Sequence, residues 1–251
     1  MPDPSPSPQD SPLAALAALE GVASAFAAAR DGLDAILRDR GLRRTPPSTT
    51  SESLLRGACA SATLEGSASP VEAMRDGEGD AVAVAALRVS GELLGLGPVL
   101  ERSPLQAFAR IHALAGAGAV DADELGRPRG AAAAERLRGV AALLSTPTQA
   151  PAMLTAALVH AEIATGTPFA SHNGIVARAA ERLVLASRRV DATSLSVPEA
   201  GHLALRPQYE SNLRGYRDGG RAGVHAWLLY AAEAYAAGVE ASPLVLRPTS
   251  D

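Results

Sequence analysis

The chain has 251 residues, a net charge of -4 at pH 7 and a sequence pI near 5.8. This acidic balance argues against a nucleic-acid partner, which would need a basic face. Hydrophobic residues make up 47% of the chain and aromatic residues only 3%, a mixture typical of closely packed helices. A chain of this length can bury a substantial core in one or two domains.

Cysteine content and hydropathy indicate the compartment. Cys59 is the only cysteine, so an internal disulfide is excluded and nothing indicates an oxidising compartment. No apolar run reaches the length expected of a membrane span. The alanine-rich segment 13–29 is interrupted by Glu20 and is preceded by no basic residue, unlike a secretory signal peptide. The sequence therefore predicts a cytoplasmic protein without a membrane partner.

Composition changes along the chain predict its domain organisation. The first residues alternate proline with polar residues and predict a disordered tail. Apolar residues then recur at helical spacing from Pro12 to about Arg40, although Gly21 weakens this pattern. The prolines in 45–50 predict a linker. We therefore divide the chain into a tail at 1–12, a helical extension with its linker at 13–50, a main domain at 51–242 and a C-terminal tail at 243–251.

Two later helix starts have a recognisable pattern. Ser69-Pro70-Val71-Glu72 and Ser103-Pro104-Leu105-Gln106 each combine a serine cap, a proline at the first helical position and Glu or Gln three residues after the cap. The glycine-rich region 116–130 predicts the longest internal loop, in which a short β-hairpin is possible. No alternating strand pattern is found, so the fold class is all-α. The expected helices are 51–68, 80–94, 103 through 114, 131–144, 149–164, 175–187, 209–216 and 224–237.

The stretch from Thr167 to Arg178 separates two of these helices. Gly166 and Pro168 end the first, and Asn173-Gly174 tolerates positive φ and predicts a tight turn before the second. The first N–H groups of a helix have no intrahelical partner and attract anions such as phosphate. Arg178 lies one helical turn later and could reach back to such an anion. The sequence therefore predicts an anion site at this loop.

The same stretch resembles the Fic signature, H-x-F-x-[DE]-G-N-G-R-x-x-R, of a family whose members mostly transfer AMP from ATP to protein hydroxyls. Five positions match it, namely Pro168, Phe169, Asn173, Gly174 and Arg178. Four positions differ. Thr167 stands where the family has its catalytic histidine, Ser171 replaces the magnesium-binding carboxylate, His172 replaces a glycine and Ile175 replaces the first arginine.

The resemblance extends from about Ser51 to Ser242. Ser61-Ala62-Thr63-Leu64-Glu65-Gly66 resembles the inhibitory-helix pattern [ST]-x-x-x-E-[GN], in the position typical of the N-terminally inhibited class. Gly126-Arg127-Pro128-Arg129 corresponds to the flap that docks the target, and the segment 207–228 resembles the C-terminal helices. The resemblance implies a Fic-type helical domain with an N-terminal extension. It also implies regulatory roles for Ser61 and Glu65, with Glu65 paired to Arg178 so that the γ-phosphate is kept from its productive position.

The substituted positions weaken the expected chemistry. A threonine hydroxyl does not titrate near neutral pH, so Thr167 cannot act as the base that the histidine provides in the family. Magnesium prefers a carboxylate ligand, which Ser171 does not provide, so a magnesium cofactor is doubtful. The main hypothesis is a divergent Fic protein that binds ATP or another nucleotide through His172, Asn173, Gly174 and Arg178. It would lack ordinary AMP-transferase activity and act as a regulator or binding module.

Two other functions remain open. One is an active nucleotidyl- or phosphotransferase of altered chemistry that modifies a protein hydroxyl, with His172 as a displaced catalytic base. The other is a purely structural interaction protein with an inactive groove. His160 and His172 have no convincing third ligand, so no metal site is predicted, and Arg182, Arg188 and Arg189 are expected on a solvated face. A protein target or partner is expected, but neither its identity nor the oligomeric state follows from the sequence.

Overall fold

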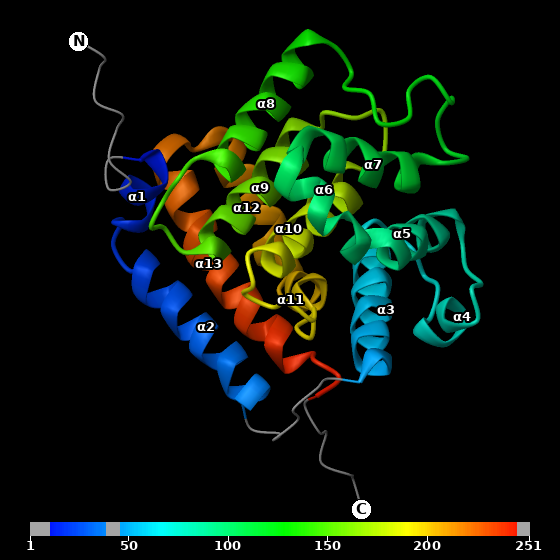
Figure 1. The fold of residues 1–251 in the computed structure, drawn as a ribbon, viewed down its shortest axis with the longest axis horizontal. Helices are drawn as coiled ribbons and strands as arrows, with labels where there is room; N and C mark the ends of the chain where they lie inside the picture. Colours follow the sequence, from blue (N-terminus) through cyan, green and yellow to red (C-terminus); the bar gives the residue numbers. More distant parts are fainter. Residues whose placement is uncertain (1–10, 39–45, 245–251) are drawn as a thin grey trace, which may run out of the picture.

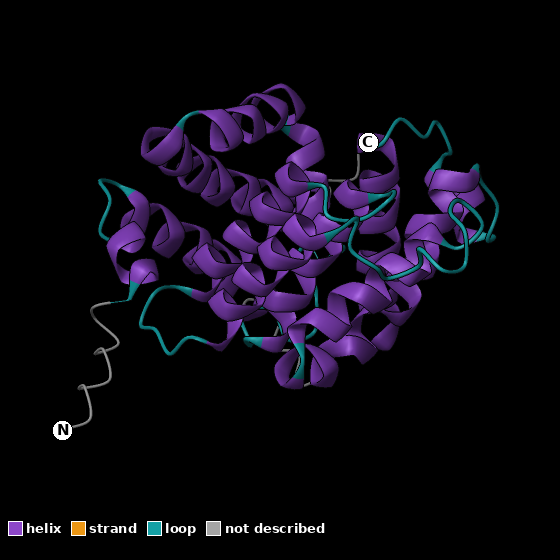
Figure 2. Ribbon diagram, turned by 90° about the horizontal axis from the view of Figure 1, so that it is seen from above, coloured by secondary structure: helices purple, strands orange, loops and turns teal. Residues whose placement is uncertain are grey.

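The computed structural model describes residues 11–38 and 46–244, and these residues form helices without a strand (Figures 1 and 2). The all-α prediction is therefore confirmed. The predicted tails lie mostly outside the described residues. The elements are α1 (Pro12–Ala17), α2 (Val22–Arg38), α3 (Pro47–Leu64), α4 (Val71–Arg75), α5 (Ala81–Glu92), η2 (Leu93–Leu96), α6 (Gly97–Arg102), α7 (Pro104–Gly116), α8 (Ala131–Ser145), α9 (Ala152–Gly166), α10 (Asn173–Ser187), α11 (Pro198–Ala204), α12 (Arg206–Asp218) and α13 (Gly220–Glu240).

Helices α9 and α10 form the centre of the structure and pack extensively against each other. Ten residues of α9 are buried, as are all those of α10 from Ile175 to Leu185. A helix that is buried on every side has no polar face, which explains why α9 reads as one apolar run. The long α13 packs against α2, α11 and α12, and Figure 1 shows α2 lying alongside it. Helix α3 packs against α5 and α11, which brings the N-terminal half of the main domain to the central pair.

Several predicted boundaries need correction. The single helix expected from Pro12 to Arg40 is two helices, because Gly21 has φ +76° and breaks the helical path. Residues 11 and 12, which were assigned to the disordered tail, belong to the start of α1. The Ser11 side chain accepts a hydrogen bond from the Ala14 N–H and caps this helix. Helix α3 begins at Pro47, inside the predicted linker, because proline is tolerated in the first helical turn.

The two predicted capping boxes do not form, although helices begin close to both positions. Helix α4 begins at Val71 and α7 at Pro104, and neither has a side-chain cap. The hydroxyl of Ser69 instead accepts a hydrogen bond from the Asp80 N–H at 3.0 Å. Asp80 is itself a cap, since its carboxylate accepts from the Ala83 N–H at 2.9 Å at the start of α5.

The possible β-hairpin in 116–130 is not formed. The loop contains one isolated bridge, between Ala117 and Val120, and the described residues contain no strand. Two hydrogen bonds fix the far end of this loop. The Gly126 N–H donates to Nδ1 of His112 at 2.9 Å, and the Arg129 N–H donates to the Pro168 carbonyl at 2.8 Å. The loop is thereby held against the stretch that resembles the Fic signature.

One continuous helical segment, Ala81–Arg102, is long and apolar enough to span a membrane by length and composition. The sequence-based statement that no run reaches this length is therefore wrong by this criterion. The criterion is weak evidence for a span, because core helices of soluble proteins also meet it. The segment comprises α5, η2 and α6, which pack against α3, α7 and α10.

Candidate functional site

The loop between α9 and α10 is held in shape by Asn173. Its side chain donates to the Phe169 carbonyl and accepts from the Phe169 N–H, both at 2.9 Å. Helix α10 begins at Asn173, so Asn173 and Gly174 lie in its first turn and do not form the predicted tight turn. The left-handed residues are Thr167, with φ 40°, and His172, with φ 52°. The predicted order of helix, loop and helix is nevertheless observed.

Phe169 anchors this loop in the core. Its side chain is fully buried and stacks on His112, with ring centroids 4.4 Å apart and an interplanar angle of 9°. Burial, together with a smaller charge repulsion from His172, lowers the pKa of His112 to about 4. His112 is therefore neutral at pH 7 and packs locally, as its position beside Ile111 on a helix suggested.

The predicted ion pair between Glu65 and Arg178 is present. Glu65 caps the C-terminal end of α3, and its Oε1 lies 2.7 Å from Nη2 of Arg178. The Arg178 side chain is 1% exposed and that of Glu65 is 32% exposed. Arg178 also donates to the Ser61 hydroxyl and carbonyl, at 2.9 and 3.1 Å, and to the Tyr209 hydroxyl at 3.1 Å. The guanidinium therefore joins α3, α10 and α12.

Gly174 shows where the Glu65 carboxylate lies. A Cβ atom added to Gly174 would come within 2.0 Å of Glu65 Oε1 and 3.2 Å of Arg178 Nη1. The carboxylate therefore occupies the space beside the first turn of α10, which the sequence assigned to an external anion. The structure brings Glu65, Ser61, Gly174 and Arg178 together at this point. The glycine is needed here because a side chain would displace the carboxylate.

His172 and Ser171 lie on the same loop. Nδ1 of His172 is 2.9 Å from the Ser171 hydroxyl. Burial lowers the pKa of His172, and Arg88 adds to this effect while Glu65 opposes it. Thr167 is exposed. Ile175 is only 2% exposed and packs in the core. This apolar side chain stands at the position where the Fic signature has an arginine.

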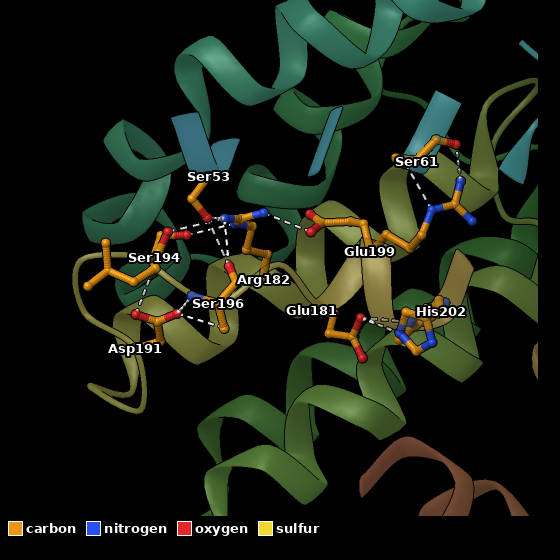
Figure 3. Close-up of polar contacts among 12 residues, drawn as sticks. Ser53, Ser61, Glu181, Arg182, Asp191, Ser194, Ser196, Glu199 and His202 are labelled. Carbon is orange, nitrogen blue, oxygen red and sulfur yellow. Dashed lines mark hydrogen bonds and ion pairs between the residues drawn. The ribbon is translucent and has the colours of Figure 1, made fainter. Parts of the chain in front are cut away.

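Arg182 is the centre of a second polar group, and the expectation that it lies on a solvated face is wrong. Its side chain is 2% exposed and its Nη1 lies 2.7 Å from Glu199 Oε2 (Figure 3). It also donates to the hydroxyls of Ser53 and Ser194, both at 2.6 Å. Glu199 is a buried residue of helix α11, which therefore forms one side of this group. Arg188 and Arg189 are exposed, as expected.

A third polar group surrounds Glu181, which the sequence analysis did not single out. Oε2 of Glu181 is 2.9 Å from Nδ1 of His160 and 3.0 Å from Nε2 of His202. Burial disfavours the ionised form of Glu181, but the two histidines hold its pKa well below the usual range. Burial lowers the pKa of His160 to about 4, although Glu181 opposes this. The available signal was His160 within the apolar run of α9, because a buried polar residue requires a partner.

Comparisons with known proteins identify the architecture. No family model matches the sequence, and no curated protein matches it. Solved structures do match. A Fic family protein from Desulfovibrio desulfuricans G20 superposes with a TM-score of 0.69 at 17% identity, over 86% of this chain and 73% of that one. The chain has a Fic-like fold.

Two structures of Fic-1 from C. elegans give the same result. A point variant superposes with a TM-score of 0.64 at 17% identity, over 87% of this chain and 71% of that one. A second Fic-1 structure gives 0.60 at 14% identity, over 88% and 71%. At these identities the comparisons establish the Fic-like fold, which agrees with the resemblance found in the sequence. Nucleotide binding by His172, Asn173, Gly174 and Arg178 remains a prediction.

Proposed function

We propose that this protein is a divergent Fic-like protein that binds a nucleotide or another phosphate compound at the start of α10 and lacks ordinary AMP-transferase activity. It acts as a regulator or binding module, and Glu65 restrains the site. The position of the Glu65 carboxylate beside Gly174 is the observation that carries this proposal, because an anionic oxygen already lies beside the first turn of α10. A phosphate would compete with Glu65 for Arg178.

The residues at the other motif positions support the absence of AMP transfer. Thr167 is exposed and supplies no base. Ser171 offers a hydroxyl group, which is hydrogen-bonded to His172, where the family has a metal-binding carboxylate. Buried Ile175 cannot neutralise phosphate charge. The nucleotide would therefore be bound without activation of its α-phosphate, and magnesium would contribute little.

An active transferase of altered chemistry is a second candidate, favoured by the contact between His172 and Ser171. His172 has a lowered pKa, so the neutral imidazole can accept a proton at pH 7. In that case His172 would replace the missing base, and a protein hydroxyl would be the acceptor.

Nucleotide binding tests the proposal. We expect ATP to raise the melting temperature of the wild-type protein slightly and that of Glu65→Gly more strongly, because Glu65→Gly frees Arg178 and the first turn of α10. One charge-assisted hydrogen bond contributes about 1.5–3 kcal/mol, so the affinity should rise roughly 10-fold to 100-fold. The shift should be the same with and without magnesium. The measurement is thermal denaturation over a series of ATP concentrations.

Glu240→Gly is the matched control, since it removes a carboxylate from the C-terminal end of another helix, α13. Its ATP response should equal that of the wild type. If ATP shifts neither the wild type nor Glu65→Gly, the binding proposal is wrong and the inactive-groove reading replaces it.

A further inference from the structure

Three helices bring metal-ligating side chains to one buried point. His160 comes from α9, Glu181 from α10 and His202 from α11, and all three are 0% exposed. Their potential ligand atoms all lie within 4.8 Å of one another. Both histidine nitrogens face the same carboxylate oxygen, at 2.9 and 3.0 Å, and Figure 3 shows Glu181 and His202 pointing toward each other.

The donor set suits a transition-metal ion. Two imidazole nitrogens and one carboxylate oxygen are ligands that zinc accepts, at about 2.0–2.2 Å from the ion. Each histidine nitrogen lies 2.9 or 3.0 Å from the carboxylate oxygen and all the donor atoms lie within 4.8 Å of one another, so side-chain movements can bring them to one shared ion. Because the glutamate has a second oxygen, Oε1, it can supply a fourth ligand to complete a four-coordinate site.

The groups around the cluster orient these ligands. The outer nitrogen of His160 lies 2.9 Å from the Tyr209 hydroxyl, and that of His202 lies 2.9 Å from the Tyr230 hydroxyl. Tyr235 donates to Oε1 of Glu181 at 2.8 Å. Metal-binding histidines commonly use their second nitrogen in such a contact, which fixes the ring and selects the inward-facing nitrogen.

The cluster contains a buried carboxylate without an arginine partner. In the described part of the chain, Arg178 donates to Ser61, Glu65 and Tyr209, and Arg182 pairs with Glu199. Neither donates to Glu181, and the sequence contains no lysine. The two histidines compensate the charge of Glu181 only when they are protonated, whereas a divalent cation would supply a permanent positive charge to this buried carboxylate.

We propose that His160, Glu181 and His202 bind one zinc ion that ties α9, α10 and α11 together. The ion is structural, because its three ligands are buried and come together only when the chain folds. In the bound form each neutral imidazole carries its proton on the outer nitrogen, facing Tyr209 or Tyr230. This site shares no ligand residue with the proposed nucleotide site, although the Tyr209 hydroxyl contacts both His160 and Arg178.

Metal content after refolding tests the zinc site. The full chain is unfolded in denaturant with a chelator, refolded with excess zinc chloride, desalted and analysed for zinc and for helix content. We expect about one zinc per folded chain. Refolding with cobalt(II) chloride should give the visible absorption bands of a four-coordinate site, and chelation should lower the melting temperature.

Variants locate the ion. His160→Gln and His202→Gln keep a hydrogen-bonding side chain but should lose the stoichiometric zinc and the cobalt bands. His225→Gln is the matched control, since His225 hydrogen-bonds to the Glu20 carbonyl at an exposed position outside the cluster, so this change should leave both unchanged. A folded wild-type protein without stoichiometric zinc would overturn the proposal and identify the cluster as a metal-free hydrogen-bond network. Full zinc retention by both variants would overturn it as well.

Discussion

Arg182→Ala is expected to lower the free energy of unfolding by about 3–5 kcal/mol, because it leaves a buried carboxylate without its cation. The stranded group is Glu199, whose side chain is 6% exposed. The same change removes the guanidinium that donates to the hydroxyls of Ser53 and Ser194, although Ser53 still donates to the Ser196 carbonyl. Gly57 shows how closely the group is packed, since an added Cβ would lie 2.3 Å from Arg182 Nη1. Relaxation around the missing guanidinium is therefore limited.

Urea denaturation followed by circular dichroism measures this effect. The matched control is Arg206→Ala, which breaks an i,i+4 pair with Glu210 whose side chains are 45% and 49% exposed. That change should cost less than about 1 kcal/mol. If Arg182→Ala is as mild as Arg206→Ala, the buried role of Arg182 in the structure is wrong.

Arg178→Ala is expected to lower the free energy of unfolding by about 2–4 kcal/mol, and Glu65→Ala by about 1–2 kcal/mol. The difference follows from burial, since Arg178 is 1% exposed and Glu65 is 32% exposed. Arg178 also donates to the hydroxyls of Ser61 and Tyr209, and both lose this donor when the guanidinium is removed, although Tyr209 keeps its contact with His160. Because Glu65 is partly exposed, water can replace part of its hydrogen bonding to Arg178 when it is removed.

A double-mutant cycle isolates the contact between the two residues. The double variant should cost less than the sum of the single changes, with a coupling of about 1 kcal/mol or more. Strictly additive losses would mean that Glu65 does not dock α3 onto α10 through Arg178.

Helix positions followed closely from the sequence because prolines and glycines punctuate this chain. Starts such as Pro104 and ends such as Gly166 were predicted within a few residues. Helix α11 was missed, because its seven residues are too few to show a period. Gly21 weakened the pattern of the first predicted helix, and the helix is interrupted at that residue.

The candidate site was predictable where a motif linked distant residues. The inhibitory pattern and the Fic-like signature together predicted the pair of Glu65 with Arg178, which are 113 residues apart. No such pattern joins Arg182 to Ser53, which are 129 residues apart, or His202 to Glu181. Side-chain periodicity shows which face of a helix is apolar, but it does not identify the helix packed against it.

Labelling with ATP tests whether this protein transfers AMP. Wild type and Glu65→Gly are incubated with ATP labelled on its α-phosphate and with magnesium, and protein-bound label is counted. We expect no transfer to the protein by either form, because Thr167 and Ser171 provide neither a base nor a metal-binding carboxylate. Stoichiometric label on either form would contradict it and establish an active transferase, and its loss in His172→Ala would then identify His172 as the base.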